Sequence, residues 1–212
     1  MPGGNGVVSS SFARAGRVLL LAGLLVSLGT PSRVHAEVPL VWSRAQDGTF
    51  SVLTASPGDA SHLYQIFEIL QRARRELSDR WQLELPMGIA VLIHPDLASY
   101  TASTAAPWYV AGVADRAEEQ IDIQRIRILI ERNTLEKTLR HELFHLAQPD
   151  DWPRWRAEGS AMRFAGEIPS AAPYLQLTEA ELEAMLAAPS SRDQLARANA
   201  TAYWWVVRER VP

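Results

Sequence analysis

The chain has 212 residues, with 21 basic and 24 acidic side chains and a net charge of −3 at neutral pH. This acidic balance argues against a nucleic-acid partner, which would need a surplus of Lys and Arg. Cysteine is absent, which excludes disulfide bonds, so stability must come from packing, to which seven tryptophans can contribute.

The N-terminus has the pattern of a secretory signal peptide. Arg14 and Arg17 precede the apolar run Val18–Leu28, and small or compact residues lead up to a cleavage site after Ala36. The run is well short of the roughly 20 residues that cross a bilayer, so no membrane span is expected after cleavage. Residues 1–36 hold three arginines and no acidic residue, so the remaining 176 residues carry a net charge of −6. That length suits a single domain over residues 37–212.

Alternating and apolar runs predict that strands dominate the first half of this domain, together with one long helix. The helix is expected over Leu63–Leu77, where apolar residues recur at helical spacing. Strands are expected over Thr49–Thr54, Met87–Ile93, Pro107–Ala114 and Gln120–Gln124.

Helical patterns fill the second half. Asn133 and Glu136 form a plausible cap for a helix ending near Ala147. Three more helices are expected. The first begins at Pro153 or Arg154 and ends at Phe164, before Gly166. The second begins at Thr178, with Glu181 as its capping partner, and the third runs from Ser190 or Ser191 to Arg208. The fold class expected from this order is α+β, with a small sheet and a helical C-terminal half.

The sequence His141-Glu142-Leu143-Phe144-His145 carries the chemistry. Two histidines four apart lie on one face of a helix, so both imidazoles can reach a single zinc ion. Glu142 is turned away from that pair but is close enough to take a proton from metal-bound water.

The rest of this helix tests whether the motif is accidental. Its leucines fall on one stripe, and His141 and His145 lie on the opposite side near Thr138, so buried core histidines fit poorly. A solvated surface pair remains open from this helix alone. The leucines of the stripe are Leu135, Leu139, Leu143 and Leu146.

The following helix supplies a third ligand. Glu158 falls on an apolar stripe with Trp155, Ala161, Met162 and Ala165, where a carboxylate is costly unless it is paired or binds metal. The neighbouring glycine, Gly159, costs about 1 kcal/mol in a helix and can mark a close approach. Glu158 is therefore the expected third zinc ligand, leaving the fourth position for water or substrate.

Other ligands compete weakly. His62 and His94 lie far upstream, and no histidine follows His145, which excludes a three-histidine site. Asp150 and Asp151 fall in the loop between the helices, where a turn or solvated role is favoured. One of these two could instead orient a ligand imidazole.

These residues resemble a known group. HELFH followed by WRAEGSA, over about Thr138–Phe164, resembles the gluzincin signature and most closely the peptidase MA-like family of bacterial proteins. Weaker similarity extends to Ala111–Ala114, to Ile121–Ile123 and to Ala202–Trp204.

The resemblance implies a mixed sheet packed on two metal-bearing helices, with His141, His145 and Glu158 as ligands and Glu142 as base. It implies that the backbone near Tyr109–Ala114 can bind a peptide as an added strand. It also offers Tyr203 as a group that stabilises the oxyanion, although Tyr203 equally fits an ordinary core aromatic.

The chain departs from the pattern in two places. Thermolysin-like enzymes carry an acidic residue four positions after the ligand Glu, where this chain has Met162. Relatives usually continue beyond the position of Pro212, which predicts that part of the substrate-binding wall is incomplete or comes from a partner.

The expected function is a secreted or periplasmic zinc metallopeptidase acting on a peptide or protein substrate. The alternatives are a non-catalytic zinc-containing envelope protein that binds peptide or cell-wall material, and a metal-free domain with an accidental motif. Neither the cleavage specificity nor the oligomeric state follows from the sequence.

Overall fold

The structure is a computed structural model that describes residues 41–44 and 48–209. The expected signal peptide, residues 1–36, and its cleavage site after Ala36 lie outside this described part.

A single five-stranded mixed sheet forms the first half of the domain. Its strand order is β1-β2-β3-β5-β4; β2, β3 and β5 are parallel, and β1 and β4 pair antiparallel at the two edges. The strands are β1 (Val41–Arg44), β2 (Phe50–Thr54), β3 (Ile89–Ile93), β4 (Gly112–Asp115) and β5 (Gln120–Ile123).

The helices are short in the first half and longer in the second, apart from α1. They are α1 (Leu63–Glu76), α2 (Leu97–Thr104), α3 (Ile126–Glu131), α4 (Leu135–Ala147), α5 (Arg154–Ala165), α6 (Glu179–Ala187) and α7 (Arg192–Glu209). A 3₁₀ turn, η1 (Pro57–His62), leads into α1, and a π-helical turn, η2 (Leu77–Trp81), continues it. The protein is thus α+β with a helical C-terminal half, as the sequence predicts.

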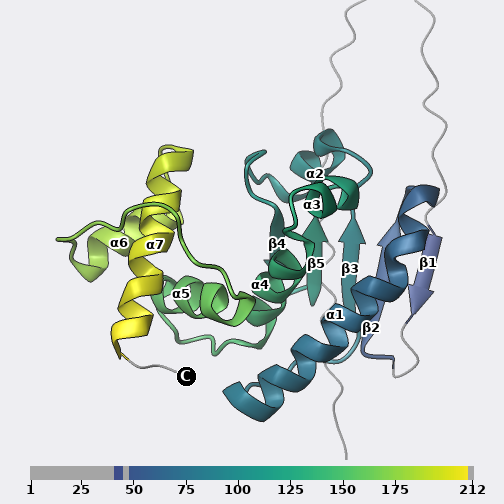
Figure 1. Ribbon diagram of the computed structural model, residues 1–212, viewed down its shortest axis with the longest axis horizontal. Helices are drawn as coiled ribbons and strands as arrows, with labels where there is room; N and C mark the ends of the chain where they lie inside the picture. The colour runs from purple at the N-terminus through teal and green to yellow at the C-terminus, as the bar shows by residue number, and fades with distance from the viewer. Residues whose placement is uncertain (1–40, 45–47, 210–212) are drawn as a thin grey trace, which may run out of the picture. The chain divides into compact units, whose positions relative to one another are not determined.

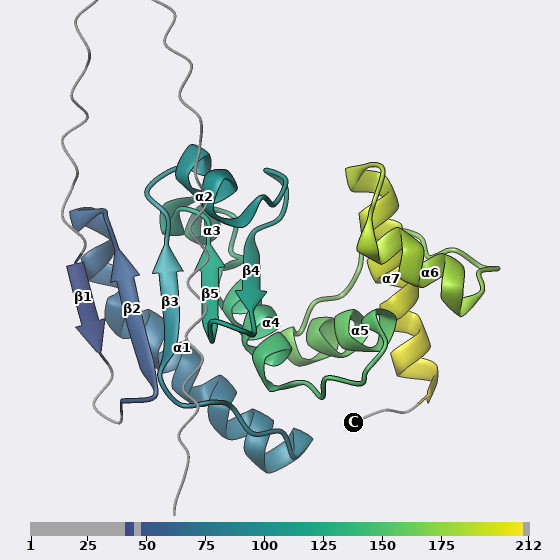
Figure 2. The ribbon, with the colours of Figure 1, turned by 180° about the vertical axis from the view of Figure 1, so that it is seen from behind.

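Helices α1 and α4 cover one face of the sheet, and α5, α6 and α7 continue beyond its β4 edge (Figure 1). The opposite view shows the strands in front of these covering helices (Figure 2). Helix α4 contacts both β4 and β5, so it lies under the edge of the sheet.

Two hydrophobic clusters hold these parts together. The larger one joins the sheet to α1 and α4 and includes Phe144 and, from α5, Phe164. The smaller one joins α5 to α6 and α7 through Trp155, Leu182 and Val206. Helix α5 therefore contributes to both clusters and connects the sheet to the C-terminal helices.

Several details differ from the sequence-based expectation, and strand β1 was not predicted. The strand expected over Pro107–Ala114 is shorter, because the Val110 N–H bonds the Pro107 carbonyl in a turn and pairing starts at Gly112. Asn133 does not cap α4. It adopts a left-handed conformation with φ of 53° in the link between α3 and α4. Thr134 takes the cap position, and its hydroxyl donates to the Leu129 carbonyl rather than capping the helix.

Helices α2 and α3, of eight and six residues, were not predicted at all. Such short helices carry too little periodicity to stand out from loops. The cap of α6 is as predicted, since Thr178 and Glu181 form a complete capping box.

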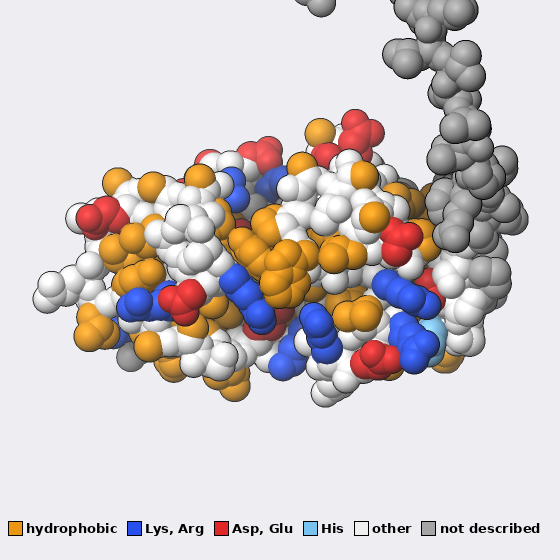
Figure 3. Space-filling view, turned by 90° about the horizontal axis from the view of Figure 1, so that it is seen from above, with side chains coloured by type: hydrophobic (Ala, Val, Ile, Leu, Met, Phe, Trp, Pro, Cys, Tyr) orange, Lys and Arg blue, Asp and Glu red, His pale blue; other side chains and the backbone are white. Residues whose placement is uncertain are grey.

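No helix of the described residues has both the length and the apolar character to cross a membrane. On the face seen in Figure 3, acidic and basic side chains are interspersed with hydrophobic ones and form no broad region of a single charge.

Candidate metal centre

Helix α4 presents its two histidines on the side away from the core. The predicted leucine stripe is buried, with Leu139 and Leu143 inaccessible to solvent, while His141 and His145 are only partly buried. Arg140 secures this helix by donating from Nε to the Phe164 carbonyl at 3.0 Å and pairing with Glu76 at 2.9 Å. The histidines thus sit on a helix that is fixed to both α1 and α5.

Helix α5 brings Glu158 to the histidines. It starts after Pro153, packs along α4, and has Gly159 at a close crossing with α7. A Cβ at Gly159 would lie 2.4 Å from the Ala202 carbonyl oxygen, which confirms that this glycine marks a close approach. The crossing leaves Glu158 partly buried, with 20% of its side chain exposed.

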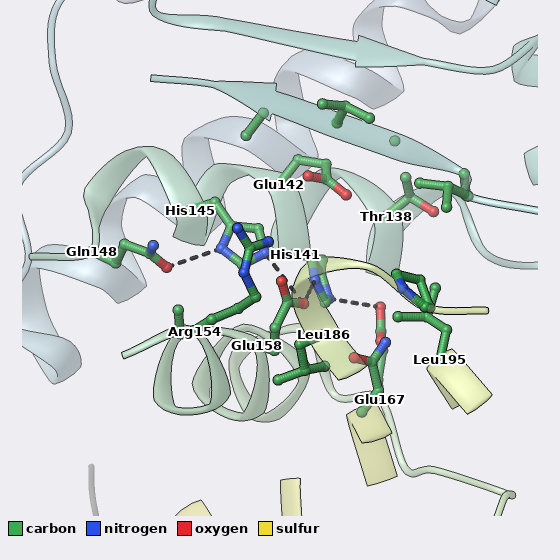
Figure 4. Close-up of a pocket in the computed structure, with 18 of the residues that line it drawn as sticks. Thr138, His141, Glu142, His145, Gln148, Arg154, Glu158, Glu167, Leu186 and Leu195 are labelled. Atoms are coloured by element: carbon green, nitrogen blue, oxygen red, sulfur yellow. Dashed lines mark hydrogen bonds and ion pairs between the residues drawn. The ribbon is translucent and has the colours of Figure 1, made fainter. Parts of the chain in front are cut away.

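The three predicted ligands converge. Nε2 of His141 lies 3.5 Å from Oε2 of Glu158, and Nε2 of His145 lies 3.7 Å from the same oxygen (Figure 4). One ligand atom from each of the three residues lies within 4.8 Å of the others. Ligands of a tetrahedral zinc ion at about 2.0–2.1 Å lie about 3.4 Å apart, which is close to the two histidine–glutamate separations, so the three residues could hold a metal ion after small side-chain shifts.

Each histidine has a partner for its other ring nitrogen. His145 Nδ1 lies 2.9 Å from Gln148 Oε1, and His141 Nδ1 lies 3.4 Å from Glu167 Oε1 (Figure 4). The hypothesis that Asp150 or Asp151 orients an imidazole is therefore wrong. Asp150 forms an ion pair with Arg116, and Asp151 is exposed. Neither is the partner of a histidine ring nitrogen.

The electrostatics of the cluster follow from burial and mutual contact. Burial alone would lower the pKa of His141, but its contacts with Glu158 and Glu167 outweigh this and hold that pKa well above its usual value. Burial would raise the pKa of Glu158, yet His145, His141 and Arg154 lower it to about 2. These groups therefore attract one another as a charged cluster, in which a cation can replace the histidine protons.

Glu142 lies beside this cluster rather than in it. It is buried, and burial raises its pKa although His141 and His145 act in the opposite direction. Its neighbour on the sheet edge is Gly112, where an added Cβ would lie 2.8 Å from Glu142 Cγ and 3.1 Å from Oε1. Strand β4 thus packs closely against the side chain of Glu142, the residue expected to act as base.

A pocket of about 790 Å³ opens over the cluster. One wall is the β4 region, including Tyr109 and Val110, and the floor carries Glu142 with the three ligand residues. The opposite wall is largely apolar and comes from the C-terminal helices and the loop between them, through Leu186, Pro189, Leu195 and Asn199. Such a volume with a few converging polar groups is typical of a substrate site.

Two other candidates named from the sequence lie elsewhere. Tyr203 is not among the residues that line this pocket, and its ring packs edge-on against Trp204. His94 is buried and pairs with Asp122 at 2.7 Å, consistent with its rejection as a ligand.

Sequence reasoning missed Gln148, Glu167 and Asn199 as residues of the site. Asn199 lies on α7 one turn before Tyr203, with its Oδ1 buried and without a partner among the described residues. The sequence offers only an indirect indication of Gln148 and Glu167: Gln148 follows His145 at the end of α4, and Glu167 follows Gly166, where α5 ends.

Comparison with known proteins adds no relative, since neither a protein-family model nor a curated protein matches this chain. Inference about function therefore rests on the geometry of the site.

Proposed function

We propose that this chain is an exported zinc-dependent metallopeptidase. The observation that carries the proposal is the convergence of His141, His145 and Glu158 on one point at the floor of the pocket. Export is proposed from the signal-like pattern that ends at Ala36.

The arrangement of ligands supports a catalytic use of the metal. Three protein ligands leave one tetrahedral position open, whereas structural zinc sites usually have four protein ligands. A zinc ion held there would act as a Lewis acid, polarising a substrate carbonyl and lowering the pKa of a water toward about 7. Glu142 would accept a proton from the attacking water and then return it to the leaving amine.

The sheet edge supports a peptide as the substrate. Within the described part of the chain, β4 pairs only with β5, and its residues Gly112–Ala114 line the pocket. An extended peptide can bond to such an edge as an additional strand, which would place a peptide carbonyl near the ligands.

The test combines metal analysis with hydrolysis. Purified protein is expected to hold one zinc ion per chain and to cleave unfolded casein, with cleavage lost on adding a chelator and restored by zinc. Glu142→Gln should retain zinc while losing hydrolysis, because the amide cannot accept the proton.

The same measurements separate the alternatives. Bound zinc without hydrolysis of any peptide library would favour a non-catalytic envelope protein. Absence of zinc, together with no effect of zinc on the melting temperature, would favour the metal-free reading and overturn the proposal.

A further inference from the structure

A carboxylate outside the predicted constellation touches the metal-binding face of α4. Glu167 lies just beyond the C-terminus of α5, and its Oε1 is 3.4 Å from Nδ1 of His141. Nε2 of the same ring faces Glu158, so the two carboxylates lie at different nitrogens of one imidazole. Glu167 is not a member of the three-residue ligand group.

The backbone holds Glu167 in this position. Gly166 adopts a left-handed conformation with φ of 68°, which turns the chain back toward α4 at the end of α5. The Glu167 N–H then donates to the Met162 carbonyl at 2.8 Å. Because Arg140 binds the Phe164 carbonyl from the residue next to His141, the end of α5 is fixed relative to that histidine.

The other ligand histidine shows the same arrangement. Nδ1 of His145 faces the Gln148 amide oxygen at 2.9 Å, while its Nε2 faces Glu158. In both rings, therefore, Nε2 faces Glu158 and Nδ1 faces a side-chain oxygen that can accept a hydrogen bond. An acceptor at Nδ1 fixes the tautomer that leaves Nε2 unprotonated and able to bind metal.

We infer that Glu167 is the positioning residue for His141 and strengthens zinc binding at the proposed site. Met162, which stands where thermolysin-like enzymes carry an acidic residue, is apolar and buried on α5, so it cannot accept a hydrogen bond from the imidazole as a carboxylate does. Glu167 supplies that carboxylate instead. The inference rests on the proposed zinc function, and it assigns Glu167 to the imidazole rather than to the ion itself. A carboxylate acceptor makes the imidazole a stronger ligand than a neutral acceptor would.

The test measures zinc affinity by competition with a chromogenic chelator. Removing such an acceptor typically weakens metal binding by 10–100-fold, so Glu167→Ala is expected to raise the Kd for zinc by about that factor. Glu167→Gln keeps an oxygen acceptor without the charge and should fall between Glu167→Ala and the wild type. Glu118→Gln, on the exposed β4–β5 turn, is the matched control and should bind like the wild type.

A second readout separates positioning from general stability. With ¹⁵N-labelled histidine, the zinc-loaded wild type should show a protected Nδ1 proton for His141, and Glu167→Ala should lose that signal while His145 keeps its own. Matching far-UV circular dichroism spectra of the metal-free wild type and variants would exclude a general loss of structure.

The outcomes distinguish two failures. Wild-type protein that binds no zinc would overturn both the proposed function and the role of Glu167. Zinc-binding wild type with an equally tight Glu167→Ala variant would overturn the positioning role alone.

Discussion

Gly112 lies so close to Glu142 that a side chain at position 112 would require one of the two to move. A Cβ on Gly112 would lie 2.8 Å from Glu142 Cγ, and the methyl group of Thr138 would be 3.0 Å away. The edge strand that borders the pocket therefore packs closely against the expected general base, with no free space for a side chain at position 112.

We expect Gly112→Ala to reduce peptidase activity without loss of zinc. The new methyl group must displace the Glu142 side chain or the strand, and a displacement of about 1 Å at a catalytic group can cost roughly 100-fold in rate. Steady-state hydrolysis and zinc content measured on the same preparation check this expectation. Gly58→Ala is a suitable control, because its nearest neighbour would be 3.9 Å away; equal activity in the two variants would contradict the prediction.

Replacing Glu158 tests the third ligand. Glu158→Ala leaves two histidines, which hold zinc much more weakly than three ligands, so the variant should lose stoichiometric zinc by elemental analysis. The loss of zinc affinity should exceed the decrease of roughly 100-fold expected for a residue that only orients a ligand. Unchanged zinc content would mean that a different residue completes the site.

Gly159→Ala tests the crossing of α5 and α7. Alanine is ordinarily favoured over glycine within a helix by about 1 kcal/mol, but here its Cβ would meet the Ala202 carbonyl oxygen at 2.4 Å. Because that oxygen belongs to the backbone, the helices must separate, and overpacking of this kind typically costs about 1–3 kcal/mol. A lower melting temperature is expected, and a higher one would show that the crossing is loose.

The metal-free and zinc-loaded proteins should respond differently to pH. The pKa of His141 is raised in the folded, metal-free protein, so its protonated form stabilises the fold below the usual histidine pKa of about 6.5. That stabilisation is lost as the pH rises through the raised pKa, and the melting temperature should fall. Zinc binding requires deprotonated histidine, so the increase in melting temperature caused by zinc should grow over the same range.

Scanning calorimetry from pH 6 to 9, with zinc or with a chelator, measures both trends. Glu158→Gln removes a charge that raises the His141 pKa and should weaken the trend of the metal-free protein. Parallel trends with and without zinc would count against a metal site made of these histidines.

Tyr203→Phe tests the oxyanion role suggested by the family resemblance. Since Tyr203 does not line the pocket and packs against Trp204, removing its hydroxyl should leave kcat unchanged. Losing one oxyanion donor typically costs about 10²–10³ in kcat, so a drop of that size would restore the role.

The clustering of the candidate ligands could be predicted in part because the spacing of the two histidines is local. His141 and His145 are one turn apart on α4, and the leucine stripe identifies which side of that helix is buried. Glu158 was recognisable as a carboxylate among apolar neighbours, next to a glycine that does mark a close crossing.

The residues that surround the ligands depend on contacts distant in sequence. Glu167 reaches His141 only because a left-handed turn at Gly166 reverses the chain, and no spacing rule encodes that approach. The same holds for Asn199, which enters the pocket through the packing of α7 on α5. Helices α2 and α3 escaped prediction because their few residues lack a complete apolar period.

The division of the protein into two hydrophobic clusters also bears on what could evolve at this site. The ligands stand on α4 and α5, which Arg140 joins at Phe164, whereas Leu186 and Leu195 on the far wall stand on α6 and α7. Helix α7 rests on α5 at a close crossing between Gly159 and Ala202, neither of which lines the pocket. If the proposed function holds, substitutions along that crossing can widen or narrow the pocket without touching the candidate ligands, so selectivity and catalysis could diverge independently.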